Sequence, residues 1–372
     1  MFKGLEFIVS NLNRGFRDRD FIESIDGLIF CVIGCVHPRD HVLAYLKYVP
    51  HMESPIRVKW SRSGVSYGRI LPYYSAMGVR ETMSFLKKNY PQYIVYDVFR
   101  SIELTEIPKE KVNFHYKPEE RLRELLISPK DPLEELAREL VTRISSESGV
   151  DLSFLGVTGS ILLGIHNTLY SDIDLIVYGY SNAIKVRNTL KALYEEDSNF
   201  SLPKGEILYS WANDIIKIHP LSLKEALLLY SKYKWNRALY RGRQFSVHPV
   251  KLEHEVREYW EEVFYKPIGV VTIKAKVIDS TDSIFIPATY IIDNVEIIEG
   301  NLPPKPIAKV VSYEGLYIDL ANPGEEVIVR GKLEEVKNVK TGEHYCQVTL
   351  GSFEAGGRDY LKPVKWFEIN VL

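Results

Sequence analysis

Leu155-Gly156-Val157-Thr158-Gly159-Ser160 and, after eleven further residues, Asp172-Ile173-Asp174-Leu175-Ile176-Val177-Tyr178 form the stretch that decides the fold. The residues up to Val157 predict a short strand. Gly159 lets the backbone approach a ligand closely because it has no Cβ atom. Ser160 is a good N-cap for a short helical run, and the N–H groups at a helix start attract phosphate. The stretch therefore predicts a strand, a phosphate-binding turn, a short helix and a second strand.

Asp172 and Asp174 are separated by one residue on the second predicted strand. Residues two apart on a strand point to the same face, so the two carboxylates converge while Ile173 and Leu175 point into a core. Adjacent carboxylates repel each other, and one takes up a proton unless a cation lies between them. Magnesium prefers carboxylate oxygens and substrate phosphates as ligands. The pair therefore predicts a site for Mg²⁺ or Mn²⁺ on Asp172 and Asp174.

A Gly-Ser turn followed by Asp-apolar-Asp on a strand resembles the signature of the DNA polymerase β-like nucleotidyltransferase superfamily. The chain looks most like the predicted archaeal nucleotidyltransferases, in which this core lies between accessory domains. The resemblance implies transfer of a nucleoside monophosphate from a nucleoside triphosphate to a hydroxyl, with pyrophosphate leaving. It implies that Gly159 and Ser160 hold the triphosphate and that Ser171 shapes the turn or contacts phosphate. Acceptors in the superfamily include RNA ends, proteins and small molecules, so RNA is one of the acceptors that the resemblance allows.

Active members of the superfamily usually carry a third carboxylate on a neighbouring strand. Asp214, within a predicted strand at 211–218, is the candidate for this third catalytic residue. A competing strand, 244–250, carries Ser246 and His248 on one face and no carboxylate, although Glu253 follows it. A carboxylate beside the aspartate pair favours an enzyme. Ser246 or His248 alone in that place favours a catalytically impaired protein that binds RNA or nucleotide, and a vestigial site predicts no nucleotide affinity.

Basic and aromatic residues alternate between positions 230 and 251, close to the aspartate pair in sequence. Basic side chains contact phosphates and aromatic rings stack on bases. Arg241 and Arg243, on either side of Gly242 in a predicted turn, are the preferred phosphate-contacting pair. The alternative is a solvated surface whose aromatic residues belong to the core.

The 372 residues, with 45% hydrophobic and 26% charged residues, predict two or three domains. A net charge of −2 gives no global attraction for nucleic acid. The sequence contains no apolar run long enough to cross a membrane and no signal-peptide pattern, so we expect a cytoplasmic protein. Three cysteines do not form a disulfide framework, and Cys31 and Cys35 suit a buried strand better than a zinc site.

These patterns predict a multidomain α+β fold. Residues 1–116 form an N-terminal α+β module with strands at 27–33, 42–49, 56–60 and 93–98 and a helix at 80–90. Residues 117–265 form the nucleotidyltransferase core, with helices at 118–126, from 132, at 182–196, at 222–233 behind a capping box, and at 252–265. Residues 266–372 form an all-β, barrel-like domain, including a short strand at 283–286. An OB-like barrel would bind single-stranded nucleic acid, and a purely structural barrel fits the pattern equally well.

Overall fold

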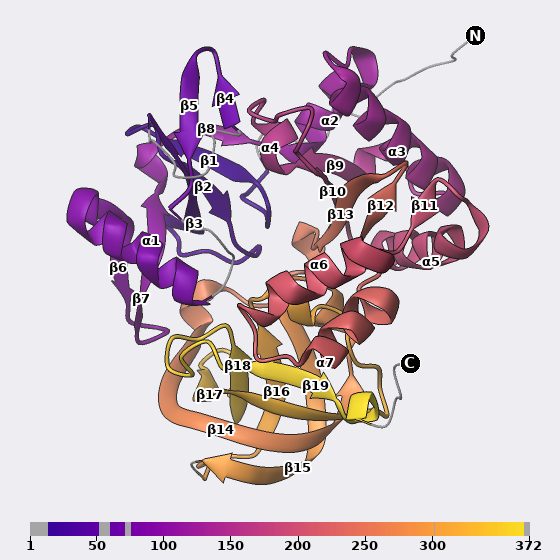
Figure 1. Cartoon of the computed structure of the whole chain (residues 1–372). Helices are drawn as coiled ribbons and strands as arrows, with labels where there is room; N and C mark the ends of the chain where they lie inside the picture. The colour runs from indigo at the N-terminus through magenta and orange to yellow at the C-terminus, as the bar shows by residue number, and fades with distance from the viewer. Residues whose placement is uncertain (1–13, 52–59, 71–75, 301, 368–372) are drawn as a thin grey trace.

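The computed structural model describes residues 14–51, 60–70, 76–300 and 302–367. Within these ranges it is a mixed α+β protein with three β-sheets, arranged as an N-terminal module and a core side by side above a C-terminal sheet (Figure 1). Of the strand predicted at 56–60, residues 56–59 lie outside the described residues. None of the described helices combines the length and the apolar character needed to cross a membrane.

The N-terminal sheet is curled, and its central strands follow the order β4-β5-β3-β2-β1-β8, with β7 on β3 and β6 on β7. Its strands are β1 (Phe21–Ser24), β2 (Ile29–Val32), β3 (His41–Pro50), β4 (Trp60–Arg62), β5 (Val65–Gly68), β6 (Ile94–Asp97), β7 (Ile102–Pro108) and β8 (Val112–Tyr116). Helix α1 (Ala76–Asn89) covers the sheet through Leu86, which is fully buried. The strands predicted from the buried runs around β2, β3 and β6, and the predicted helix, are confirmed.

The core sheet has the order β11-β12-β13-β10-β9, with β10 parallel to β13 and antiparallel to β9. Its strands are β9 (Leu155–Thr158), β10 (Ile173–Tyr178), β11 (Phe200–Ser201), β12 (Arg237–Tyr240) and β13 (Arg243–Val250). Ile173, Leu175 and Val177 pack against the helices on one face, as the alternation predicts. Asp174 therefore faces the other side, towards the N-terminal module.

Within the described residues, the core contains six α-helices: α2 (Pro118–Ile127), α3 (Pro132–Ser148), α4 (Gly159–Leu162), α5 (Tyr180–Glu196), α6 (Gly205–Ile216) and α7 (Leu223–Leu228). Helix α3 begins where predicted because Asp131 Oδ1 accepts hydrogen bonds from the N–H groups of Leu133 and Glu134. The predicted capping box is also present, since Ser222 and Glu225 bond reciprocally at the start of α7.

Two predicted elements of the core are wrong. The segment 211–218 is not a strand but the end of α6, because Ile215 and Ile216 pack one side of a helix against the C-terminal core. The segment 252–265 is not a helix. It consists of two short 3₁₀ turns, Glu253–Glu255 and Trp260–Glu262, followed by the start of β14. The Trp260 indole donates a 2.6 Å hydrogen bond to Asp97, which ties this segment to the N-terminal module instead.

The C-terminal sheet is a closed ring, as the barrel-like expectation requires. Hydrogen bonds connect β14-β15-β16-β18-β17, and β17 pairs back onto β14, while β19 adds to β17. The strands are β14 (Val263–Asp279), β15 (Ala288–Gly300), β16 (Ile307–Ser312), β17 (Glu326–Asn338), β18 (His344–Leu350) and β19 (Tyr360–Pro363). The ring thus begins at Val263, three residues before the predicted boundary at 266, and the predicted strand 283–286 is instead a 3₁₀ turn at Thr281–Ile284.

Lys234 is buried where the core meets the C-terminal ring. Its Nζ atom donates hydrogen bonds to the backbone oxygens of Gly315 and Leu316, the latter at 3.1 Å. Next to it the Trp235 indole donates to Asp319 at 2.9 Å. Burial, together with the charge of Arg237, lowers the pKa of Lys234 to about 7. A charged ammonium at this boundary is therefore costly.

This burial predicts a pH-dependent stability. Because the folded pKa of Lys234 lies below its unfolded value, the unfolded chain binds more protons between pH 7 and 10, and the free energy of unfolding rises with pH in that window. The rise attributable to Lys234 is about 2 kcal/mol from pH 7 to pH 9. Urea denaturation at both pH values gives the free energy of unfolding of the wild type and of Lys234→Met. The contribution of Lys234 is the change with pH in the wild type minus the change with pH in Lys234→Met. Parallel pH dependences would contradict the assignment.

The N-terminal module is fixed against the core by buried polar contacts. Arg14 lies between Asp20 and Glu119, at 2.6 Å and 2.5 Å. The Thr158 hydroxyl, at the end of β9, donates a 2.7 Å hydrogen bond to the backbone oxygen of Arg19. Arg19 has a left-handed backbone with φ of 66°, which is uncommon for a residue with a side chain. These contacts hold the module in a defined position over the aspartate pair.

Candidate functional site

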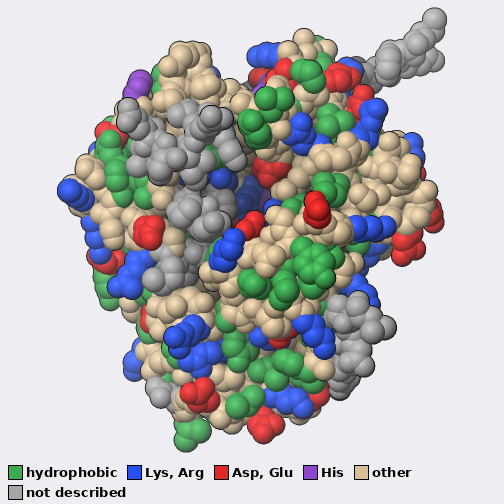
Figure 2. Space-filling view, in the orientation of Figure 1, with side chains coloured by type: hydrophobic (Ala, Val, Ile, Leu, Met, Phe, Trp, Pro, Cys, Tyr) green, Lys and Arg blue, Asp and Glu red, His purple; other side chains and the backbone are tan. Residues whose placement is uncertain are grey.

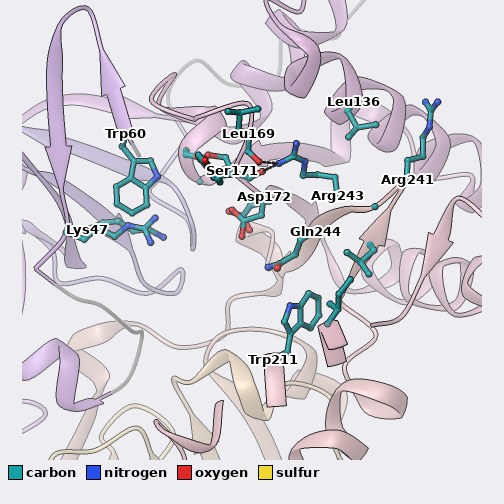
Figure 3. Close-up of a pocket in the computed structure, with 18 residues that line it drawn as sticks. Lys47, Trp60, Leu136, Leu169, Ser171, Asp172, Trp211, Arg241, Arg243 and Gln244 are labelled. Carbon is teal, nitrogen blue, oxygen red and sulfur yellow. Dashed lines mark hydrogen bonds between the residues drawn. The ribbon is translucent and has the colours of Figure 1, made fainter. Parts of the chain in front are cut away.

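A cavity of about 700 Å³ opens between the N-terminal module and the core (Figure 3). Figure 2 shows this face of the molecule hollowed at its centre, with acidic and basic side chains inside the hollow. The predicted motif residues that line it are Gly159, Ser160, Ser171, Asp172 and Asp174. The other lining residues include Lys47, Trp60 and Arg69 of the N-terminal module, Ile207 and Trp211 of α6, and Arg241, Gly242, Arg243 and Gln244. The structure therefore brings the Gly-Ser turn and both aspartates of the motif to one cavity.

Asp174 lies at the centre of the core sheet, with Thr158 of β9 and Ser246 of β13 as its register partners. Its carboxylate rests against the Gly159 backbone so closely that a Cβ atom at position 159 would lie 2.3 Å from Asp174 Oδ2. Gly159 also has a φ of 68°. A glycine is thus required at this turn both by its conformation and by the space that Asp174 occupies.

The two aspartates differ in their environment. The charge of Asp174, together with burial, raises the pKa of Asp172 to about 6. Burial also opposes ionisation of Asp174, but His248, the Ser246 hydroxyl at 2.5 Å and the charge of Lys47 hold the pKa of Asp174 below its usual value. The repulsion between the two carboxylates therefore makes ionisation of Asp172, and not of Asp174, less favourable. A divalent cation on the pair would relieve that repulsion, so the two oxygen donors fit Mg²⁺ or Mn²⁺.

The third carboxylate predicted from the resemblance is not beside the pair. Asp214 lies on α6, pairs with Lys217 at 2.9 Å and is more than half exposed. It is not among the residues that line the cavity. Glu253 pairs with Arg17 of the N-terminal module at 2.6 Å. Among the described lining residues, Asp172 and Asp174 are the acidic ones.

Ser246 and His248 stand where the sequence analysis places the competing strand without a carboxylate. Ser246 pairs in register with Asp174, and His248 Nε2 lies 2.8 Å from the Ser246 oxygen and 3.7 Å from Asp174 Oδ1. Burial and the charge of Arg19 lower the pKa of His248 to about 4, so the imidazole is neutral at pH 7. Ser246 and His248 in this place, without a carboxylate, favour binding without catalysis.

The two arginines predicted to contact phosphate have protein partners. Arg241 pairs with Glu139 on α3 at 2.7 Å, and its side chain points away from Asp172 (Figure 3). Arg243 donates three hydrogen bonds to backbone oxygens of the loop before Asp172, at Thr168, Leu169 and Ser171, over 2.9–3.1 Å. Arg243 therefore positions the loop that leads into the aspartate pair.

Ser171 closes the same loop. Its hydroxyl accepts a 3.0 Å hydrogen bond from the Asn167 N–H, and its own N–H donates to the Asn167 oxygen at 2.9 Å. Of the two roles predicted for Ser171, these bonds support shaping the turn.

Substitution of Arg243 by alanine removes all three loop contacts and is expected to weaken magnesium-dependent nucleotide binding about tenfold, as Asp172 loses its fixed position. Arg241→Ala is the matched control, because an exposed ion pair contributes at most about 1 kcal/mol. Isothermal titration with ATP and magnesium measures both. A larger loss in Arg241→Ala than in Arg243→Ala would identify Arg241 as the ligand contact instead.

The N-terminal wall of the cavity was not predicted. The positive charge of Lys47, on β3, favours the ionised form of both Asp172 and Asp174 and so acts to lower the pKa of each. Arg69 follows β5 and stacks on Trp60, with the guanidinium carbon 4.0 Å from the ring centre. The charges of Arg19 and Asp174 also attract each other. Alternating exposure on a strand gives no local signal for such roles, because Asp172 and Asp174 lie more than a hundred positions further along the chain.

A second acidic cluster is explained by the fold. Asp131, Glu134 and His166 have potential ligand atoms within 4.8 Å of one another. Asp131 caps α3, its other oxygen lies 2.7 Å from His166 Nε2, and Glu134 pairs with Arg121. Because capping and ion pairing already use these carboxylates, the cluster ties α3 to the segment behind α4.

No protein-family model matches the chain, and no solved structure matches it. A relative from Methanocaldococcus jannaschii, the uncharacterized protein MJ1086, is 31% identical over 349 residues, which cover 93% of this chain and 98% of the relative. Identity over nearly the full length of both chains extends across the N-terminal module, the core and the ring. The chain therefore belongs to the same protein family as MJ1086.

Proposed function

We propose that the cavity binds a nucleoside triphosphate with Mg²⁺ or Mn²⁺ and transfers the nucleoside monophosphate to a hydroxyl acceptor, on a polymerase β-like core. The observation that carries the proposal is the aspartate pair within a cavity of about 700 Å³, with Asp174 packed against the Gly159 turn. A cavity of this volume suits a ligand of nucleotide size. The repulsion that raises the pKa of Asp172 supports a cation between the carboxylates.

Asp172 and Asp174 would hold the metal, which supplies charge stabilisation for the transferred phosphoryl group. Ser160 lines the cavity together with the pair, and its hydroxyl would donate a hydrogen bond to a phosphate oxygen. Ser246, on the neighbouring strand β13, fixes the Asp174 carboxylate by a hydrogen bond. Arg243 holds the loop before Asp172, so the two carboxylates keep a defined separation.

Nucleotidyl transfer is tested by incubating the protein with each α-labelled triphosphate, magnesium and a set of acceptors: RNA, the protein itself and small hydroxyl compounds. Magnesium-dependent release of pyrophosphate together with label on one acceptor is the expected result. If the protein binds the triphosphate with magnesium but releases no pyrophosphate with any of the acceptors, and none when Mn²⁺ replaces magnesium, transfer is contradicted. Nucleotide binding would still stand.

A second candidate, a protein that binds nucleotide without transferring it, is favoured by Ser246 in register with Asp174, where a third carboxylate would be expected. The same experiment separates the two candidates, because only transfer releases pyrophosphate. Nucleotide binding that is lost when the metal is removed, without turnover, is the outcome that this candidate predicts.

Binding of RNA by the C-terminal ring receives less support. The closed five-strand ring suits an OB-like barrel, in which the second and third strands bind oligonucleotides. The second strand of the ring, β15, carries the exposed residues Asp293, Glu296 and Glu299. Acidic side chains on this strand repel a phosphate backbone.

A further inference from the structure

The positive charge that the core offers to the cavity is largely committed to the protein. Arg243 is bonded to three backbone oxygens, and Arg241 is paired with Glu139 and turned away from Asp172 (Figure 3). Arg237 lies over the Trp211 ring at 4.4 Å. A triphosphate carries more negative charge than one divalent cation neutralises. A polyphosphate in this cavity therefore needs cations from the opposite wall.

That wall carries two cations close together. Both side chains line the cavity, and burial, together with the positive charge of Arg69, lowers the pKa of Lys47. Lys47 lies across the cavity from Asp172 and beside Trp60 (Figure 3). Two like charges held together beside a cavity attract an anion that can bridge them.

Aromatic side chains hold Arg69 in place. Its guanidinium lies 4.0 Å from the centre of the Trp60 ring and 4.8 Å from that of Tyr48, and it donates a 2.6 Å hydrogen bond to the Tyr48 hydroxyl. Tyr48 is fully buried. A guanidinium stacked in this way keeps a fixed orientation, so its positive charge stays at the wall of the cavity.

We propose that the N-terminal module supplies the polyphosphate subsite of the cavity, with Lys47 and Arg69 contacting the phosphates and Trp60 orienting Arg69. The inference rests on the proposed function and adds to it the ligand class that the module recognises, a magnesium-bound polyphosphate. The site is then composite: the core holds the metal and the N-terminal module holds the phosphate chain.

The test compares ligands that differ in their phosphates. Binding of ATP, AMP and inorganic tripolyphosphate is measured with magnesium by isothermal titration for the wild type, Lys47→Ala and Arg69→Ala. Each substitution removes a charge-assisted contact and is expected to weaken ATP and tripolyphosphate binding about tenfold or more. The affinity for AMP should change less than about twofold, since AMP lacks the distal phosphates.

Lys87→Ala is the matched control, because Lys87 belongs to the same module, forms an exposed pair with Glu103 and does not line the cavity. Arg69→Lys should restore part of the tripolyphosphate affinity, since it retains the charge. Thermal unfolding of each variant reports whether the module remains folded. Equal losses for ATP and AMP in a folded variant would overturn the phosphate role.

The outcomes also separate this inference from the function on which it rests. A wild-type protein that binds neither ATP nor tripolyphosphate with magnesium overturns both. A wild-type protein that binds both ligands, with Lys47→Ala and Arg69→Ala unchanged, overturns the composite subsite alone and leaves the metal site on the core intact.

Discussion

Replacement of Asp172 and Asp174 by asparagine is expected to abolish magnesium-dependent nucleotide binding, with an affinity loss of about 100-fold or more, since the metal loses both of its charged ligands. The protein should remain folded. Asparagine keeps the shape of each side chain, and the repulsion that raises the pKa of Asp172 is removed. Titration of ATP with and without magnesium measures the effect, and thermal unfolding checks the fold.

Asp214→Asn is the matched control for this experiment. Asp214 is an exposed aspartate on α6, three residues after the cavity residue Trp211, and it pairs with Lys217. We expect its replacement to leave magnesium-dependent binding unchanged. If Asp214→Asn instead removes binding or transfer as fully as the double variant does, Asp214 reaches the metal and the two-carboxylate description of the site is wrong.

Gly159→Ala should be nearly as damaging as the loss of the aspartates. The added Cβ atom would lie 2.3 Å from Asp174 Oδ2, so the carboxylate has to move away from the turn. Displacement of a metal-binding group by about 1 Å costs on the order of 100-fold in activity. We therefore expect a loss of about 100-fold in magnesium-dependent binding and transfer, measured with the same titration and pyrophosphate assay.

Gly164→Ala separates this clash from backbone strain. Gly164 has a φ of 62°, close to the 68° of Gly159, but a Cβ atom there meets nothing within 4 Å. Both substitutions carry a strain of about 1–2 kcal/mol from the left-handed backbone. Only Gly159→Ala should impair the site, so equal losses of nucleotide binding in the two variants would show that strain in the segment, and not contact with Asp174, is responsible.

Local patterns were sufficient to predict the central part of the site. The Gly-Ser turn and the alternation around Asp172 and Asp174 depend on backbone geometry within a few residues, and the two strands form as expected. The predicted N-cap is wrong, because α4 begins at Gly159 with Thr158 in the N-cap position, and Ser160 lies within the helix. The helix start at Asp131 and the capping box at Ser222 are equally local, and both are present. The assignment of these residues to nucleotidyl transfer stays a prediction.

Elements whose form depends on distant partners were not predictable. The apolar residues of 211–218 suit a strand or a helix, and the choice is made by the C-terminal core, against which Ile215 and Ile216 pack. Trp260 has the sequence surroundings of a helix, but its indole bonds to Asp97 in another module. Arg241 appears available for phosphate until Glu139, about a hundred positions earlier, is brought beside it.

The position of β10 also has a consequence for how the chain can be divided. Asp174 is flanked by β9, which precedes it, and by β13, which follows more than sixty residues later. A fragment that ends before β13 leaves β10 with an exposed, strongly apolar edge, and such edges pair with other chains. During synthesis the N-terminal module, with Lys47, emerges long before this edge is covered. Magnesium-dependent nucleotide binding should therefore appear only in chains that extend past Val250, and shorter fragments should aggregate.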